Sequence, residues 1–185
     1  LVLFMSKKLR TFGVQNPDDY WKDRAKEGRT AKKRVHHFIH ELCNELAPTN
    51  SKVLVCGVGD GHEFELCSKD YLTYGVEWSS EAISGYDFPT DTIIQADLNN
   101  GLPDFGTKFD IITISMVLHW LNEPETFLSN CKPSINENGG LVVIIPNITH
   151  YRYRIKYVFG EFPPISPSHK NFQTPAECEI MFEKA

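Results

Sequence analysis

The sequence lacks a run of about twenty apolar residues, the length that an α-helix needs to cross a bilayer. Its first residues also lack the charged and apolar regions, followed by small residues, that mark a secretory signal. We therefore expect a soluble, cytoplasmic protein without a membrane partner. Basic residues are not in excess, because 19 Lys and Arg stand against 24 Asp and Glu, for a net charge of −5. Since a nucleic-acid binder needs a basic face, we expect no nucleic-acid partner.

Closely spaced cysteine pairs are missing too. The five cysteines are odd in number, and none forms the Cys-x-x-Cys pattern of a zinc or redox site (Cys43, Cys56, Cys67, Cys131 and Cys178). We expect reduced thiols, mostly in the core, rather than disulfides or a metal. His36 and His40 lie one helical turn apart and offer the alternative of a metal chelate, but without a third ligand nearby a solvated helix face is favoured.

At 185 residues and 41% apolar content, the chain is long enough for one domain with a substantial core. Residues 1–4 precede Met5, so we expect residues 1–15 to be an N-terminal extension that is partly vector-derived. Residues 16–185 are expected to form a single domain. Within it, residues 147–185 change character and predict an elaboration on the substrate side of the fold, with a basic-aromatic helix at 151–156, a Pro-rich loop at 163–167 and a last helix from Thr174.

Three glycines follow an apolar, β-branched run that starts at Val53. Gly57, Gly59 and Gly61 are spaced two apart, and residues 62–67 can start a helix. Glycine permits positive φ and a close approach of backbone to a ligand, and a helix start presents unpaired N–H groups to negative charge. The stretch is therefore predicted to be a strand, a ligand-binding turn and a helix, although a plain strand-to-helix turn is the alternative.

Strand and helix patterns alternate along the rest of the chain. A helix is predicted to begin at Asn16–Trp21, and further helices at 30–46, 62–69 and 79–84 and from Pro124. Residues 138–140 are expected to turn the chain before the last strand. The strands are expected at 52–57, 71–77, 92–95, 109–115 and 141–146. This alternation predicts an α/β fold with a doubly wound, mainly parallel, Rossmann-like sheet.

Polar residues follow three of these strands at the edge where parallel sheets bind ligands. Glu77 follows the second strand, Asp97 the third and Ser115 the fourth. A carboxylate after the second strand can accept hydrogen bonds from both hydroxyls of a ribose. A carboxylate after the third strand can accept a hydrogen bond from an adenine amino group. Taken separately, Glu77 is also explained as a surface acid and Asp97 as a turn residue. Together they indicate a ligand that carries adenosine.

The glycine spacing separates two cofactor classes. A dinucleotide fold prefers Gly-x-Gly-x-x-Gly, whose third glycine would fall at His62, which disfavours a nicotinamide oxidoreductase. The Gly-x-Gly-x-Gly present here resembles motif I of the class I S-adenosylmethionine-dependent methyltransferases. That resemblance implies S-adenosyl-L-methionine as the cofactor and a small molecule as the methyl acceptor. It also implies cofactor contacts by the three glycines and by Glu77, Trp78, Asp97, Leu98 and Ser115.

Within this family the chain is most similar to the group that includes the methionine biosynthesis protein MetW. The likeness lies in residues 57–61, in residues 97–102 and in Pro146-Asn147 followed by Arg154 and Gly160. Members of this shape end in an antiparallel hairpin, and the chain stops where it would begin, so five strands are expected here. The family usually has an acid where this sequence has Val55, so a non-catalytic protein on the same fold is a second hypothesis.

His119 is the candidate catalytic residue. It lies in the segment 115–120, which resembles the part of the family fold that lines the methyl-transfer site. A histidine there can act as a general base, but a histidine beside a tryptophan after a strand is more often a packed residue of the wall. The same ambiguity applies to the cluster at 151–156, which is either a solvated face or part of an acceptor pocket.

Overall fold

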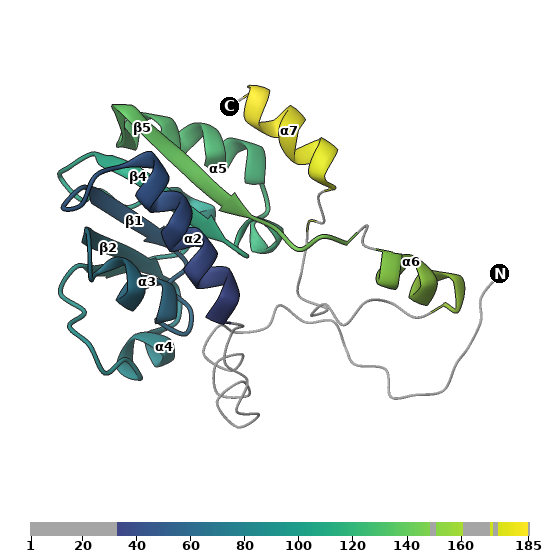
Figure 1. The fold of residues 1–185 in the computed structure, drawn as a ribbon, viewed down its shortest axis with the longest axis horizontal. Coiled ribbons are helices and arrows are strands. Elements are labelled where there is room, and N and C mark those ends of the chain that lie inside the picture. Colours follow the sequence, from purple (N-terminus) through teal and green to yellow (C-terminus); the bar gives the residue numbers. More distant parts are fainter. Residues whose placement is uncertain (1–32, 149–150, 161–170, 172–173, 185) are drawn as a thin grey trace.

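The computed structural model describes residues 33–148, 151–160, 171 and 174–184. They contain one sheet with the strand order β3-β2-β1-β4-β5, and every neighbouring pair is parallel (Figure 1). The order reverses between β1 and β4, where such sheets bind ligands. The strands are β1 (Lys52–Cys56), β2 (Leu72–Glu77), β3 (Ile93–Gln95), β4 (Phe109–Ser115) and β5 (Ile135–Ile144). The doubly wound α/β fold and its five parallel strands are therefore confirmed.

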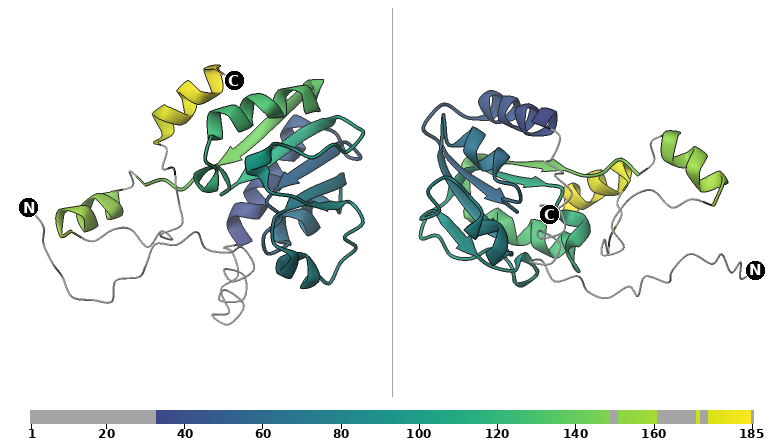
Figure 2. Two further views of the ribbon diagram at one scale, coloured as in Figure 1. Left: turned by 180° about the vertical axis from the view of Figure 1, so that it is seen from behind. Right: turned by 90° about the horizontal axis from the view of Figure 1, so that it is seen from below.

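Helices cover both faces of this sheet. Helices α2 (Lys33–Leu46) and α3 (His62–Cys67) pack on one face, and α5 (Pro124–Cys131) packs on the other with α7 (Pro175–Lys184) beside it (Figure 2). The short α4 (Ser80–Ser84) follows β2, and α6 (Tyr151–Val158) stands apart from the sheet (Figure 1). Three 3-10 turns, η1 (Leu98–Asn100), η2 (Leu118–Trp120) and η3 (Lys132–Ser134), complete the described part.

The alternation of side chains along β1 divides the core into two layers. Val53 packs with Ile39 and Cys43 of α2, whereas Leu54 packs with Phe127 of α5 on the opposite face. The central strands are buried on both faces, which explains their nearly continuous apolar sequences. All five cysteines are free and buried, as the sequence predicted.

The described residues lack two other features. None of their helices has the length and apolar character required to cross a membrane. Nor do they contain a group of three or more His, Cys, Asp or Glu side chains that could hold a metal ion. The helix start expected at residues 16–21 and the Pro-rich loop at 163–167 lie outside the described residues.

The predicted turn at residues 138–140 is wrong. Asn138, Gly139 and Gly140 lie within β5, which begins at Ile135. The pairing with β4 is irregular there, because Phe109 is opposite Ile135 whereas Ile111 is opposite Gly140. The glycines serve this close approach of two strands rather than a reversal of the chain. A Cβ atom on Gly139 would lie 2.7 Å from the carbonyl oxygen of Asp110.

Two adjacent substitutions test this account of the β4–β5 irregularity. Gly139→Ala is expected to lower the free energy of unfolding by about 1–3 kcal/mol, because its Cβ would also lie 2.6 Å from Cγ2 of Ile135. Gly140→Ala is the matched control, since nothing lies within 4 Å of its Cβ position, and it is expected to be neutral or slightly stabilising. Urea denaturation measures both. Equal losses in the two variants would contradict the account.

Candidate functional site

The loop between β1 and α3 has three residues in the left-handed backbone region. Gly57, Gly59 and Gly61 have φ angles of 79°, 63° and 83°. The loop is also tightly packed, because a Cβ atom on Gly57 would lie 2.5 Å from Cγ2 of Val117. The backbone N–H of Gly57 donates to the carbonyl of Val76 at 2.8 Å, which ties the loop to the end of β2. Glycine is thus required here by the backbone, as the sequence predicted.

Glu77 holds this loop from the end of β2. Its Oε2 accepts a hydrogen bond from the N–H of Gly59 at 2.8 Å. Its Oε1 accepts from the N–H groups of Trp78 and Ser79, each at 2.9 Å. The side chain is only 6% exposed. The carboxylate therefore organises the protein's own backbone, and its predicted contact with a ribose stays a prediction.

Two aromatic residues behind the loop were missed by the sequence analysis. The hydroxyl of Tyr86 donates to the carbonyl of Gly59 at 2.9 Å. Phe88 stacks between Tyr86 and Phe64, with ring centroids 4.8 and 5.3 Å apart. Burial raises the pKa of Tyr86 well above its usual range, and the nearby carboxylates of Glu77 and Asp60 add to the rise, so the hydroxyl stays a neutral donor. Only the tertiary fold brings these rings to the loop.

The third strand leads to Asp97 and Leu98. Oδ1 of Asp97 accepts from the backbone N–H of Asn99 at 2.9 Å and from its side-chain amide at 2.8 Å, so the acid caps η1. The side chain of Leu98 is 7% exposed and packs in the core near α5. Asp97 lies where the adenine contact was predicted, at the end of β3. The adenine contacts of both residues remain predictions.

Two large apolar side chains are exposed at the same edge of the sheet. Trp78 follows Glu77 and is 41% exposed, and Met116 follows Ser115 at the end of β4 and is 43% exposed. Met116 also has a φ angle of 58°, which is uncommon for a residue other than glycine. Strained backbone of this kind is often found at functional sites. The segments after β2 and β4 thus present apolar surface on either side of the glycine loop.

The candidate catalytic residue, His119, lies in η2 and is 2% exposed. Its ring centroid lies 5.9 Å from that of Trp120. Its carbonyl oxygen accepts from the N–H of Asn171 at 3.2 Å, which joins η2 to the segment before α7. This burial fits the packing alternative better than the general-base alternative.

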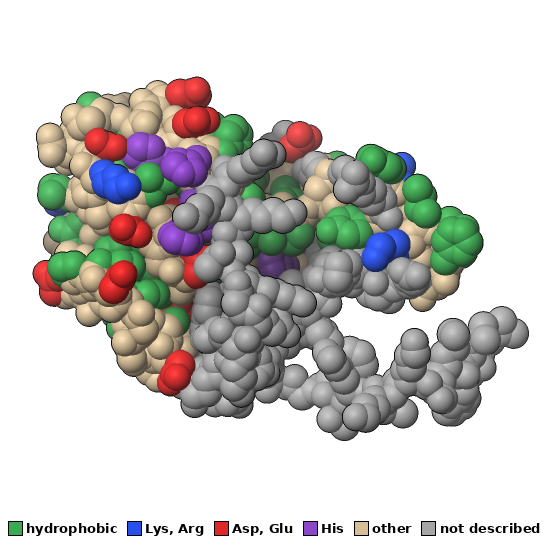
Figure 3. Space-filling view, turned by 60° about the horizontal axis from the view of Figure 1, so that its bottom comes forward, with side chains coloured by type: hydrophobic (Ala, Val, Ile, Leu, Met, Phe, Trp, Pro, Cys, Tyr) green, Lys and Arg blue, Asp and Glu red, His purple; other side chains and the backbone are tan. Residues whose placement is uncertain are grey.

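A buried carboxylate lies beneath the loop on the face covered by α2. Glu63, in the first turn of α3, is 3% exposed, and its Oε1 accepts from the hydroxyl of Thr113 at 2.5 Å. Nδ1 of His36 lies 3.6 Å from Oε2 of Glu63, and Nε2 of His36 lies 4.0 Å from Oδ1 of Asp60. Figure 3 shows histidine side chains close to acidic ones on one face of the molecule. Sequence reasoning missed Glu63, because its contacts with β4 and α2 join segments that are distant in the sequence.

These contacts predict a pH dependence of stability. The carboxylate of Glu63 raises the pKa of His36, burial opposes the rise, and Asp60 adds to it. A raised pKa in the folded state contributes stability that is fully present below the unfolded value of about 6.5 and is lost as the pH rises through the folded value. The stability difference between wild type and His36→Gln is therefore expected to be larger at pH 6 than at pH 8.5 in urea denaturation.

The control for this experiment is His37→Gln, which changes an exposed histidine on the same helix. Its stability difference from wild type is expected to vary little over the same pH range. A further titratable group near His36, within the described part of the chain, is His62, whose ring centroid lies 6.2 Å away. A His36→Gln difference that stays constant between the two pH values would contradict the proposed pairing.

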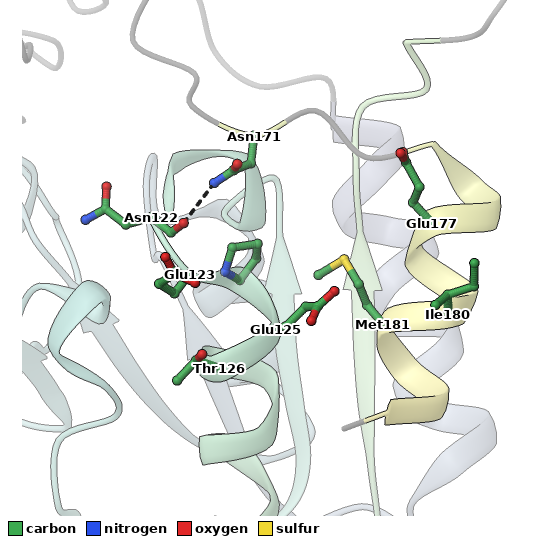
Figure 4. A pocket seen from close by; sticks show the side chains of 9 residues that line it. Asn122, Glu123, Glu125, Thr126, Asn171, Glu177, Ile180 and Met181 are labelled. Atoms are coloured by element: carbon green, nitrogen blue, oxygen red, sulfur yellow. Dashed lines mark hydrogen bonds between the residues drawn. The ribbon is translucent and has the colours of Figure 1, made fainter.

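Two cavities lie away from the glycine loop. One, of about 400 Å³, lies between the start of α5 and α7 and includes three acids, Glu123, Glu125 and Glu177 (Figure 4). The side-chain amide of Asn171 closes one end by donating to the carbonyl of Asn122 at 3.3 Å. The other, of about 600 Å³, is mostly apolar and is lined by residues of α2, the end of β5 and Cys178. Residues of the loop line neither of them.

Comparison with known proteins finds one matching family model and solved structures with a similar fold. A family model described as methionine biosynthesis protein MetW matches residues 37–175. A methyltransferase from Archaeoglobus fulgidus, described as SAM-dependent, is 20% identical over 89% of this chain and 72% of its own, with a TM-score of 0.63. The plantazolicin methyltransferase BpumL, solved in complex with SAH, is 18% identical over 90% of this chain and 68% of its own, with a TM-score of 0.64.

A third structure, an S-adenosylmethionine-dependent methyltransferase from Clostridium acetobutylicum, is 18% identical over 75% of this chain, with a TM-score of 0.56. The chain spans only 58% of that protein's length. Among curated proteins, none matches the sequence significantly. At these identities the solved structures establish the fold, and the match to the family model covers most of the chain.

Proposed function

This chain belongs to the family of methionine biosynthesis protein MetW, and from that membership we propose that it binds S-adenosyl-L-methionine and transfers its methyl group to a small-molecule acceptor. The observation that carries the proposal is the joint geometry at the switch point of the sheet. There, a loop of three left-handed glycines is bonded to Glu77 at the end of the neighbouring strand. Fold alone does not define activity, so the argument rests on these residues.

The residues at this edge fit such a cofactor. The loop leads bare backbone from the end of β1 to the start of α3, and a Cβ atom at Gly57 would have no room beside Val117. Trp78 and Met116 present apolar side chains on either side, which suits the adenine and the methionine chain of the cofactor. Glu77 and Asp97 provide carboxylates for the ribose hydroxyls and the adenine amino group. Ser115, at the end of β4, would face the methionine moiety.

The proposed chemistry asks little of the protein beyond alignment. When bound, S-adenosylmethionine supplies a methyl group that its sulfonium already activates toward a nucleophile. The glycine loop and the two carboxylates would fix the orientation of the cofactor. The segment after β4 would place the acceptor in line with it, and this proximity and orientation can provide most of the rate enhancement. A dedicated base is not required for an acceptor that is already nucleophilic.

Binding and transfer are tested separately. Isothermal titration with S-adenosylhomocysteine is expected to show one site per chain. In a thermal-shift panel, S-adenosylhomocysteine is expected to raise the melting temperature, whereas NAD and NADP are not. Incubation with methyl-labelled cofactor and the small-molecule fraction of a cell extract is expected to yield a labelled product. The absence of any shift or heat with S-adenosylhomocysteine would reject the proposal.

A second candidate function is a non-catalytic protein that binds the cofactor or a partner on the same fold. It is favoured by the burial of His119 and by the apolar Val55, which is 1% exposed where the family usually has an acid. Cofactor binding without transfer of label to any fraction of the extract would support this candidate. A labelled product would reject it.

A further inference from the structure

We propose that Glu63 is a positioning residue that fixes the glycine loop through a polar network linking α3, β4 and α2. In the proposed function this loop holds the cofactor, and to that extent the inference rests on that function. Glu63 makes no part of the adenosine-binding set described above. It lies in the first turn of α3, two residues after Gly61.

The first link of the network joins α3 to the central strand β4. Oε1 of Glu63 accepts a hydrogen bond from the hydroxyl of Thr113 at 2.5 Å, and the side chain of Thr113 is completely buried. Thr113 is paired in register with Val55 of β1, the strand that leads into the loop. Paired residues of neighbouring strands project to the same face of the sheet. The carboxylate of Glu63 therefore lies over the end of β1, directly before the glycines.

The second link joins the loop to α2. The imidazole of His36 faces two carboxylates, with 3.6 Å between Nδ1 and Oε2 of Glu63 and 4.0 Å between Nε2 and Oδ1 of Asp60. Asp60 is itself a residue of the loop, between Gly59 and Gly61. One ring from α2 therefore bridges the start of α3 and the middle of the loop. The side chains of all three residues are largely buried, with 12% exposure for His36, 16% for Asp60 and 4% for Glu63.

Packing alone does not explain a carboxylate at this position. Apart from these polar partners the surroundings are apolar, since Val55, Val58 and Phe64 form a small buried cluster. Burying a charge is costly unless it is paired and hydrogen-bonded, and an apolar side chain would fill such a site at least as well. A polar network can instead specify one conformation of the backbone around it. Glu63 is thus better explained by the conformation of the loop than by the stability of the core.

The expected consequence is a loop that is ordered before the cofactor arrives. Preorganisation of this kind raises affinity because less conformational freedom is lost on binding. The strand position that faces Thr113 is apolar in this chain, because it is occupied by Val55. A carboxylate reaching the same place from α3 can hold the loop where β1 provides none. A carboxylate at position 55 combined with an apolar side chain at position 63 should then preserve the function of the network.

The test compares four variants: Glu63→Leu, Glu63→Gln, Val55→Asp and the double variant Val55→Asp/Glu63→Leu. Hydrogen–deuterium exchange of the segment 57–61 is measured in the protein without ligand, and the Kd for S-adenosylhomocysteine is measured by titration. In Glu63→Leu we expect at least tenfold faster exchange and about tenfold weaker binding. Glu63→Gln is expected to lie between, since its amide can still accept from Thr113 but carries no charge toward His36. The double variant is expected to recover most of the lost protection from exchange and most of the lost affinity.

Glu65→Gln is the matched control, because it changes an exposed acid on the same helix. It is expected to leave exchange and affinity unchanged. Should Glu63→Leu fail to fold, Glu63→Gln and the double variant still decide the question. An unchanged rate of hydrogen–deuterium exchange in Glu63→Gln, together with no recovery in the double variant, would overturn the inference. If the wild type fails to bind S-adenosylhomocysteine while Glu63→Gln accelerates exchange, the proposed function is rejected and the positioning role of Glu63 is supported.

Discussion

Glu77→Ala is expected to weaken the binding of S-adenosylhomocysteine at least tenfold, about 1.4 kcal/mol. The substitution removes the acceptor for the N–H groups of Gly59, Trp78 and Ser79 at once. Hydrogen bonds to a charged group contribute about 1.5–3 kcal/mol each, and a buried donor left without a partner adds its own penalty. We therefore also expect the free energy of unfolding to fall by about 3 kcal/mol or more, measured by urea denaturation.

Glu77→Gln separates the two effects. The amide keeps one acceptor oxygen, which can serve the N–H groups of Trp78 and Ser79, but it places an NH₂ group opposite Gly59 or the ligand. Stability is expected to fall less than in the alanine variant, while affinity still falls, since a ribose diol donates preferentially to a carboxylate. Isothermal titration measures the affinity. An unchanged Kd in a folded Glu77→Ala protein would remove Glu77 from the cofactor site.

Gly57→Ala is expected to cost about 2–5 kcal/mol of folding stability. The φ angle of 79° alone costs an alanine about 1–2 kcal/mol. The new methyl group would in addition lie 2.5 Å from Cγ2 of Val117, and such overpacking typically costs about 1–3 kcal/mol. Since Val117 follows the exposed Met116, relief of this clash would move the segment after β4 and weaken cofactor binding as well.

Gly106→Ala is the matched control for Gly57→Ala. Its φ angle is also positive, at 65°, but nothing lies within 4 Å of its Cβ position. It is expected to lose only the backbone term, about 1–2 kcal/mol, and to bind S-adenosylhomocysteine like the wild type. The difference between the two variants isolates the contact with Val117. Equal losses of stability would show that the loop can move away from the segment after β4.

Local sequence patterns predicted most of the fold because each pattern has a local physical cause. The apolar run from Val53 gave a buried strand, and the glycine spacing gave the left-handed turn that was found. Glu77 could be placed at the ligand edge because the carboxyl ends of parallel strands meet there. The turn expected at Asn138–Gly140 failed for a nonlocal reason. The irregular pairing of β5 with β4 uses glycine to bring two backbones together, and a single strand cannot show this.

The parts of the site that sequence reasoning missed are contacts between distant segments. Tyr86 reaches Gly59 across 27 positions, and Thr113 reaches Glu63 across 50. Such pairs follow from the order of the strands and the packing of α2 and α3 on one face, and no spacing rule encodes them. Likewise, the sequence placed Glu77 at the ligand edge but did not show that its carboxylate bonds to the glycine loop. Its contact with a ribose stays a prediction. A residue can be placed at the correct edge of the sheet before its partners are known.

The buried thiols allow local opening of the structure to be measured by chemical labelling. Alkylating reagents attack the thiolate, and burial raises the pKa of Cys131 to about 12 and also raises the pKa of Cys56 well above its usual range. Labelling of Cys56 and Cys131 therefore requires that the structure opens first, and the rate at each of these two cysteines measures the population of that local opening. Cys56 directly precedes Gly57, whereas Cys131 lies at the end of α5. If addition of a ligand slows the labelling of Cys56 more than that of Cys131, the ligand binds at the loop, and this can be learned without a structure of the complex.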